Sequence, residues 1–293
     1  MSRSNPGIHS IQVGDVTVTA LNDGQFQADY ATVAGLGQAE TETLLRDSFR
    51  VTPPRISVSC FLIEAAGRRI IVDFGAGGKF GALLGYAMNR LADLEVEPNS
   101  IETILLTHAH VDHIGGLMDD GGAPIFDNAE LVVNAAEVAF WSDDAIRGGA
   151  PDDAKGYFDL ARTAFSAYAG RTRQIGDKQE VLPGITAHHL PGHTPGHTGY
   201  TIESGGQSLF IWADTVHLPG IQYARPDAGV TFDTDVEQAR TTRRRVFDMA
   251  AQDRVMVAGI HHDFPLFGHV RRDGGAYAFE PAVWAPSATG LMV

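Results

Sequence analysis

Residues 107–116 read Thr-His-Ala-His-Val-Asp-His-Ile-Gly-Gly, and they follow directly on the apolar run Ile-Leu-Leu at 104–106. The apolar run predicts a buried β-strand, and the polar stretch begins where that strand should end. Three histidines and one carboxylate fall within six positions: His108, His110, Asp112 and His113. Neutral imidazole is the commonest metal ligand in proteins. The stretch therefore predicts a metal site at a strand end, and a chance cluster of surface histidines is the weaker interpretation.

The spacing of the four residues suits two metal ions. His108 and His110 are two residues apart, so both side chains can point to one side as the chain leaves the strand. Asp112 and His113 begin the next turn, which we expect to open a helix through Gly115-Gly116, and they would face a neighbouring point. Hydrolytic centres with two metal ions hold them about 3.5–4 Å apart and share a water-derived ligand.

Later segments supply further candidate ligands. A turn rich in Gly and Pro at 190–198 leaves a histidine free to project, and two apolar runs, 208–213 and 255–260, each end at polar residues. The candidates are His193 in the turn, Asp214 after the first run, and His261 with His262 after the second. We therefore expect each strand end to deliver a ligand to one centre.

The order of these blocks resembles the metallo-β-lactamase superfamily. Thr-His-x-His-x-Asp-His is its signature, and Gly-His-Thr-x-Gly-His, an Asp-Thr after a strand and a late His follow in order. Residues 213–217, 222–226 and 264–270 are similar to the methyl parathion hydrolase branch, which includes lactonases and arylesterases. The resemblance implies an α/β fold, the four-layer αββα sandwich, and the alternation of predicted strands and helices agrees with two sheets between helical layers.

The resemblance also implies how the ligands divide between two ions. One metal falls to His108, His110 and His193, the other to Asp112, His113 and His261, with Asp214 as the bridge. The family's late ligand lies three residues before Phe-Pro, which selects His261 and leaves His262 as a pocket or solvated residue. Two divalent ions per chain are expected, taken as zinc, although such N/O sites also accept manganese, cobalt or iron.

The implied activity is hydrolysis of lactones, aryl esters or phosphotriesters. Two bound ions lower the pKa of water from about 15.7 to about 7, so a hydroxide held between them needs no Ser or Cys nucleophile. Asp112, Asp214 and His217 are the candidate catalytic residues; His217 stands where lactonase relatives carry a Tyr near the substrate oxygen, and a structural role for it stays open. Two alternatives also stay open: a glyoxalase II-like thioesterase, and a mono-iron sulfur dioxygenase with fewer ligands.

Residues around the ligands are assigned supporting roles. Asp73, which ends the run 69–72, matches the family's early Asp and is expected to orient ligands by hydrogen bonds, as are Thr194 and His197. The family's usual Gly is replaced by Ala213 before the bridge and by Leu266 after Phe-Pro. Apolar pocket walls are expected from the N-terminal region and from four further side chains: Leu218, Ile221, Tyr223 and Phe264.

Composition fits a single enzyme domain. The chain has 293 residues, of which 44% are hydrophobic, enough for one substantial core over residues 1–293. Residues 1–54 are predicted to form an N-terminal arm that acts as a lid or a dimer contact, and a homodimer is expected. The lone cysteine, Cys60, excludes an internal disulfide and lies in an alternating strand, which assigns it to the core.

Charge bears on the partners. With 36 acidic and 22 basic residues the net charge is −14, which repels nucleic acids and anionic membranes, so neither is expected as a partner. The run Arg243 to Arg245 is assigned to a solvated helix face or ion pairs. No targeting or membrane-spanning stretch is evident, and a cytoplasmic location is expected.

Hydrophobic periodicity predicts the main elements. Strands are expected near 8–21, 55–73, 104–106, 130–134, 185–190, 208–213 and 255–260, and helices over 78–93, 153–169 and 236–251.

Overall fold

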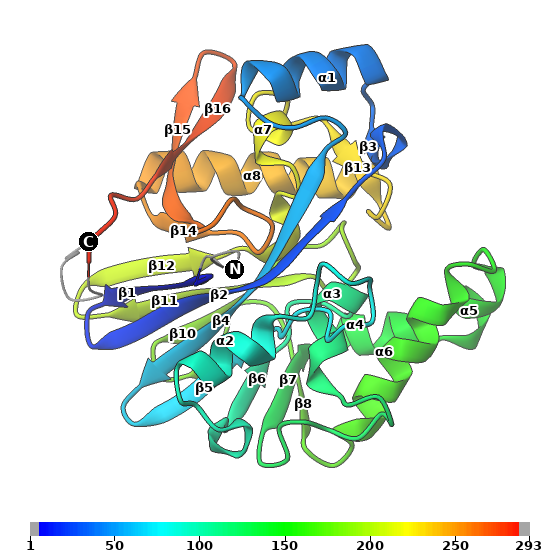
Figure 1. The fold of residues 1–293 in the computed structure, drawn as a ribbon, viewed down its shortest axis with the longest axis vertical. Helices are drawn as coiled ribbons and strands as arrows, with labels where there is room; N and C mark the ends of the chain where they lie inside the picture. Colours follow the sequence, from blue (N-terminus) through cyan, green and yellow to red (C-terminus); the bar gives the residue numbers. More distant parts are fainter. Residues whose placement is uncertain (1–5, 287–293) are drawn as a thin grey trace, which may run out of the picture.

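The structure, a computed structural model that describes residues 6–286, is built on two seven-stranded sheets (Figure 1). The first sheet has the order β1-β2-β4-β5-β6-β7-β8, and the second has the order β16-β15-β14-β12-β11-β10-β9. The first contains β1 (Ile8–Val13), β2 (Val16–Gln27), β4 (Arg55–Ala65), β5 (Arg68–Val72), β6 (Thr103–Leu105), β7 (Glu130–Asn134) and β8 (Thr172–Ile175). The second contains β9 (Gln179–Leu182), β10 (Ile185–His189), β11 (Thr198–Ser204), β12 (Gln207–Ile211), β14 (Met256–Ala258), β15 (Phe267–Asp273) and β16 (Ala276–Pro281).

Helices cover the outer faces of both sheets (Figure 1). The helices of the described chain are α1 (Gln38–Asp47), α2 (Ala87–Asp93), α3 (Val111–Ile114), α4 (Ala135–Ser142), α5 (Asp144–Gly149), α6 (Lys155–Ala167), α7 (Pro219–Gln222) and α8 (Val236–Asp253). Helices α2, α4 and α6 lie on the first sheet and α8 lies on the second. A separate pair of short strands, β3 (Val33–Ala34) and β13 (Gly229–Val230), is antiparallel. Among the described residues, no helix combines the length and apolar character needed to cross a membrane.

Alternation along the strands explains the layers. On β4, Phe61 and Ile63 join the core between the two sheets, whereas Cys60 and Leu62 join a core on the other face. Successive strand side chains point to opposite faces, so a strand covered on both sides is apolar throughout. On β12 the inner core takes Leu209 and Ile211, while Phe210 packs with side chains of α8. The order of layers is therefore helices, sheet, sheet, helix, and the predicted αββα sandwich is confirmed.

Most predicted elements are present, but one helix is shorter than expected. The periodic stretch 78–93 forms a helix only from Ala87, as α2. Gly78, Gly81 and Gly85 all have positive φ angles, which glycine adopts readily and which a helix does not allow. The apolar spacing of 78–86 thus belongs to a loop. For most other elements, the observed bounds agree with the expected ones to within two residues on at least one side. This holds for the strands expected at 8–21, 130–134 and 185–190 and for the helices expected at 153–169 and 236–251.

The expected N-terminal arm divides into two parts. Residues 8–27 form β1 and β2, which pair with each other and with β4 in the first sheet. Beyond them, Val33 and Leu45 pack against Leu218 and Ile221 in a small apolar cluster. This part therefore packs on its own chain, and the predicted dimer contact stays a prediction.

Candidate metal centre

All seven predicted ligands lie together, and they come from the ends of strands in both sheets. His108 and His110 occupy the loop after β6, and Asp112 and His113 lie in α3, which begins at Val111. His193 lies in the turn between β10 and β11, Asp214 follows β12, and His261 follows β14. β5, β6 and β7 are parallel, so their carboxyl ends lie at one edge of the first sheet. His108, His110, Asp112 and His113 follow β6 at that edge.

The first three histidines direct one nitrogen each toward a common point. Nε2 of His108 lies 3.0 Å from Nδ1 of His110 and 3.1 Å from Nε2 of His193. Zinc bonds to imidazole nitrogen at about 2.0–2.1 Å in a tetrahedral arrangement, so two such nitrogens lie about 3.3 Å apart. The spacing of the trio is therefore close to that of ligands around one ion.

Asp214 lies at the middle of the whole group. Its Oδ2 is 3.0 Å from Nε2 of His261, 3.2 Å from that of His193 and 3.3 Å from that of His113. The same oxygen is 3.6 Å from Nε2 of His108 and 3.1 Å from Nε2 of His217. One carboxylate oxygen thus faces five imidazole nitrogens.

The second group is completed by Asp112. Its two oxygens lie 3.7 Å from Nε2 of His113 and 3.7 Å from Nε2 of His261. Nε2 of His113 and Oδ1 of Asp214 are buried and have no hydrogen-bond partner among the described residues. Because buried polar atoms are normally paired, these unpaired atoms fit a divalent cation, and the N/O donor set suits zinc and related ions.

The electrostatics of the centre favour added positive charge. Burial alone would raise the pKa of Asp214, but the surrounding imidazoles, His113 first, hold it well below its usual value. Burial opposes protonation of His193, yet the carboxylates of Asp214 and Asp233 raise its pKa to about 9. Such a side chain attracts either a proton or a metal ion, so metal binding would release protons.

Burial instead keeps two ligands of the first trio neutral. It lowers the pKa of both His108 and His110 well below the usual histidine value, and the neighbouring imidazoles act in the same direction. A neutral imidazole is the form that ligates a metal.

A hydrogen bond fixes the second ring nitrogen of four ligands. Nδ1 of His113 donates to Asp73 over 2.7 Å, and Nδ1 of His261 donates to the carbonyl of Ser57 over 2.7 Å. Nδ1 of His193 is 2.9 Å from Asp233, and Nδ1 of His108 is 3.0 Å from the hydroxyl of Thr107, which itself donates to Asp73. Such partners set the orientation and tautomer of metal ligands.

Some of these supporting residues follow from the sequence and others do not. Asp73 contacts His113 as expected, and His197 accepts from the backbone N–H of Asp214 over 3.0 Å. Asp233, which contacts His193, could not be identified from the sequence, because it lies in a loop far from any ligand motif. For the arginine run, the expectation of a solvated face is wrong at Arg243, which is buried and donates to the carbonyls of Thr215, Pro226 and Ala228. The ion-pair alternative holds there, because Arg243 lies 4.0 Å from Asp233. Arg244 does form a surface ion pair, with Asp227.

Ala213 and Leu266, which replace glycines common in the family, both have a left-handed backbone conformation. Ala213 has φ +48° and Leu266 has φ +79°, a region where a Cβ is costly and glycine is favoured. The backbone is held there by its surroundings: Ala213 and Leu266 are both fully buried in the core between the sheets. The replacements therefore leave Asp214 in place, as expected, at the cost of local strain.

His262 and His217, whose roles the sequence left open, are both buried. His262 is buried, and its Nε2 lies 2.9 Å from the hydroxyl of Tyr223, away from the ligand group. It is thus a core residue, and the expectation of a pocket or solvated residue was wrong. His217 is buried beside the ligands, its ring stacked on that of His261 at 5.0 Å, and burial lowers its pKa to about 4.

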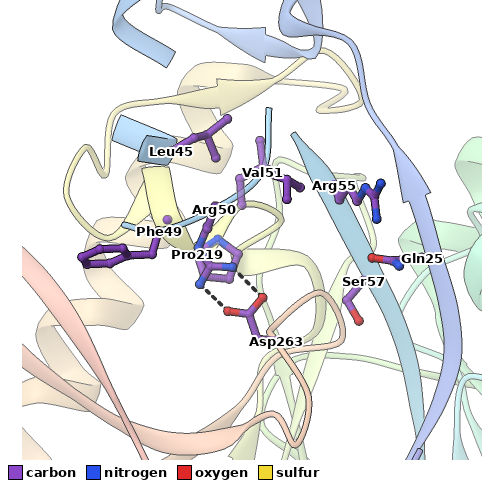
Figure 2. Close-up of a pocket in the computed structure, with 11 residues that line it drawn as sticks. Gln25, Leu45, Phe49, Arg50, Val51, Arg55, Ser57, Pro219 and Asp263 are labelled. Atoms are coloured by element: carbon purple, nitrogen blue, oxygen red, sulfur yellow. Dashed lines mark hydrogen bonds and ion pairs between the residues drawn. The ribbon is translucent and has the colours of Figure 1, made fainter. Parts of the chain in front are cut away.

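Two hollows share Arg50 and Asp263 in their walls, and neither is lined by a candidate ligand. The first, of about 270 Å³, is bordered by Ser57 and Leu218 and crossed by the ion pair of Arg50 with Asp263 (Figure 2). The second, of about 330 Å³, also has Tyr223, Phe264 and Phe279 in its wall. Of the expected pocket walls, Leu218 lines the first hollow, Tyr223 and Phe264 line the second, and Ile221 is wholly buried.

Aromatic side chains flank the ligands directly. Trp141 packs edge-on against His110 at 5.6 Å, and Phe232, which is 40% exposed, lies 6.3 Å from His217. These rings, which sequence reasoning did not single out, provide apolar surface beside the centre.

Comparison with known proteins agrees with this geometry. An N-acyl homoserine lactonase of Bacillus sp is 26% identical over 246 residues, which cover 76% of this chain and 86% of the lactonase. The structure of AbOPH, a hydrolase of the beta lactamase superfamily, is 29% identical and superposes with a TM-score of 0.90 over 97% of this chain and 100% of that one. Among the curated relatives, the matches span 53% to 86% of the relative's length.

The dizinc quorum-quenching lactonase AidC, solved with a product, has the same fold. It superposes with a TM-score of 0.90 at 24% identity over 95% of this chain and 98% of its own. Residues 53–261 match the model of the metallo-beta-lactamase superfamily. The chain therefore belongs to the metallo-β-lactamase superfamily.

Proposed function

We propose that the chain is a dinuclear metal-dependent hydrolase that opens lactones or cleaves aryl esters and phosphotriesters. The observation that carries the proposal is the position of Asp214, whose Oδ2 lies within 3.6 Å of five imidazole nitrogens. A carboxylate shared by that many potential ligands suits a bridge between two cations. The lactonase and hydrolase relatives support small ester-like substrates.

The residues fit two ions as follows. His108, His110 and His193 would hold the first, Asp112, His113 and His261 the second, and Asp214 both. When bound, two such ions supply an activated water and Lewis acidity toward a carbonyl or phosphoryl oxygen. No Ser or Cys nucleophile is then required, in agreement with the buried position of Cys60.

The chain's own residues have distinct parts in this chemistry. Asp214 would place negative charge between the two cation sites, and Asp112 would place it beside the second. His217 is neutral around pH 7, because burial lowers its pKa to about 4. Its Nε2 lies 3.1 Å from Oδ2 of Asp214, and its Nδ1 has no hydrogen-bond partner among the described residues. We assign it to donate a hydrogen bond to the substrate oxygen or the leaving group.

Metal analysis together with a substrate panel tests the proposal. Protein purified without oxygen should contain about two divalent ions per chain, and a lactone, an aryl acetate, a thioester and a phosphotriester should be assayed side by side. Asp214→Asn should lose the bridge, one ion and activity together, because an amide is a weak ligand. One iron per chain would indicate the sulfur dioxygenase instead, and preference for the thioester would indicate the glyoxalase II-like activity.

A matched control separates the bridge from general charge loss. Asp227 is an exposed aspartate that pairs with Arg244 on the surface, and Asp227→Asn should retain both ions and full activity. Full activity in Asp214→Asn would refute the bridge assignment.

A further inference from the structure

Glu137 is a buried carboxylate that the chemistry above does not use. It lies in the first turn of α4 and has no exposed surface. A buried carboxylate is costly unless its oxygens are hydrogen-bonded. Glu137 meets that condition fully, because four donors from three parts of the chain converge on it.

Each oxygen of Glu137 accepts from one of the two ligand-bearing loops, and Oε1 also accepts from Trp141 of the same helix. Oε1 accepts from the backbone N–H of Ala109 over 2.9 Å and from Nε1 of Trp141 over 2.6 Å. Oε2 accepts from the hydroxyl of Thr194 over 2.6 Å and from the backbone N–H of Gly196 over 3.0 Å. Ala109 lies between His108 and His110, and Thr194 directly follows His193. One carboxylate therefore joins the two loops that carry the first histidine trio.

His110 depends on this arrangement more than the other ligands do. Its Nε2 makes no hydrogen bond within the described part of the chain, whereas the other histidine ligands are each fixed by a polar partner. Its ring instead packs edge-on against Trp141 at 5.6 Å. Trp141 is in turn held by its hydrogen bond to Glu137. The backbone N–H of Ala109, next to His110, donates to the same carboxylate, so Glu137 supports both the ring and the backbone at His110.

Gly196 shows how closely the second loop approaches α4. A Cβ added to Gly196 would lie 2.2 Å from the backbone nitrogen of Glu137. The absence of a side chain at Gly196 allows its N–H to reach Oε2, and the loop is pressed directly on the start of the helix.

We propose that Glu137 is a positioning residue that sets the spacing between His108, His110 and His193, and so the affinity of the first metal site. The inference rests on the proposed function, since it requires that a cation binds there. Hydrogen bonds to a charged group are stronger than those between neutral groups, so the carboxylate, and not merely a polar group of its size, is required. The second site, made by Asp112, His113 and His261, does not touch Glu137.

Glu137→Gln tests the requirement for charge at nearly constant shape. The amide oxygen can serve only one of the two loops, and the amide NH₂ then faces the N–H groups of the other. Metal-free protein would be titrated with Zn²⁺ against a chromophoric chelator, and the wild type should show two binding events. The variant should bind one zinc 10- to 100-fold more weakly, the usual range for loss of a residue that orients a ligand, and the other within about twofold.

Three further variants assign the effect. His110→Ala removes a ligand of the first site, so the event that it abolishes should be the one that Glu137→Gln weakens. Thr194→Val removes one donor and keeps the charge; it should weaken the same event by less than tenfold, and it provides the test if Glu137→Gln does not fold. Glu130→Gln makes the same chemical change at a surface glutamate paired with Arg173 and should leave both affinities unchanged.

The outcomes separate a positioning role from a purely structural one. If Glu137→Gln lowers the melting temperature of metal-free and metal-loaded protein equally and leaves both zinc affinities unchanged, the inference is wrong while the proposed function stands. A wild-type chain that binds no zinc would overturn the proposed function and this inference together.

Discussion

Asp73→Asn separates the charge of a supporting residue from its shape. Asp73 accepts three hydrogen bonds: from Nδ1 of His113 over 2.7 Å, from the backbone N–H of Thr107 over 2.8 Å and from the Thr107 hydroxyl over 2.7 Å. Its backbone has φ +53°, a conformation that Asn tolerates well. The substitution therefore adds no backbone strain, and its effects report on the side chain.

The expected magnitude follows from the bond to His113. An asparagine can still accept from the Thr107 N–H, but its NH₂ would face the Nδ1–H of His113. To keep a hydrogen bond, His113 must move its proton to Nε2, the atom that faces Asp214, and a protonated nitrogen cannot ligate a metal. Loss of a hydrogen bond to a charged group amounts to about 1.5–3 kcal/mol, so we expect about 10- to 100-fold weaker zinc binding.

Zinc competition with a chelator measures this loss at the site that contains His113. Hydrolysis should fall at limiting zinc and recover in excess zinc, because the substitution weakens binding without removing a ligand. Unchanged affinity, or a loss confined to the event that His110→Ala abolishes, would refute the reasoning.

Three other changes test separate parts of the structure. Burial lowers the pKa of His262 from 6.5 to about 4, so the unfolded chain binds a proton that the folded chain excludes, and stability falls as the pH drops between these values. The free energy of unfolding is measured by urea titration in the presence of a chelator, for the wild type and for His262→Gln. The wild-type value minus the variant value should decrease by about 3 kcal/mol from pH 7 to pH 4. A difference that stays constant with pH would contradict the pKa shift. A Cβ on Gly116 would lie 2.0 Å from the carbonyl oxygen of Phe74, so Gly116→Ala should lower the free energy of unfolding by about 1–3 kcal/mol, and a melting temperature equal to the wild type would count against that close contact. His217→Phe should reduce kcat by about 100-fold or more with zinc content unchanged; loss of zinc on elemental analysis would make His217 a ligand instead.

The convergence of the seven candidate ligands could be predicted because each one follows a strong local signal. An apolar run followed by a polar residue marks a strand end, and the strand ends of a layered sheet meet at one edge. The same logic failed for 78–93, where three glycines with positive φ outweigh helical spacing. It also failed for His262, because after β14 ends at Ala258 the chain turns and no strand periodicity applies.

The supporting residues could not be predicted from local pattern. Asp233 and Glu137 reach His193 and the ligand loops from 40 and 28 residues away along the chain. Nothing in a helix start such as 134–137 distinguishes a buried acceptor from an ordinary first-turn acid. Only the packing of α4 against the two loops gives Glu137 its partners.

The origin of the ligands in both sheets has a consequence for how long the protein survives. His108 through His113 belong to the N-terminal half of the sandwich, whereas His193, Asp214 and His261 belong to the other half. Cations held there would link the two halves of the sandwich. A ligand at one hundred times its Kd stabilises the native state by about 2.7 kcal/mol. Metal starvation would then shorten the lifetime of the protein in a cell as well as abolish its activity, because the metal-free protein unfolds more often and is then open to proteases.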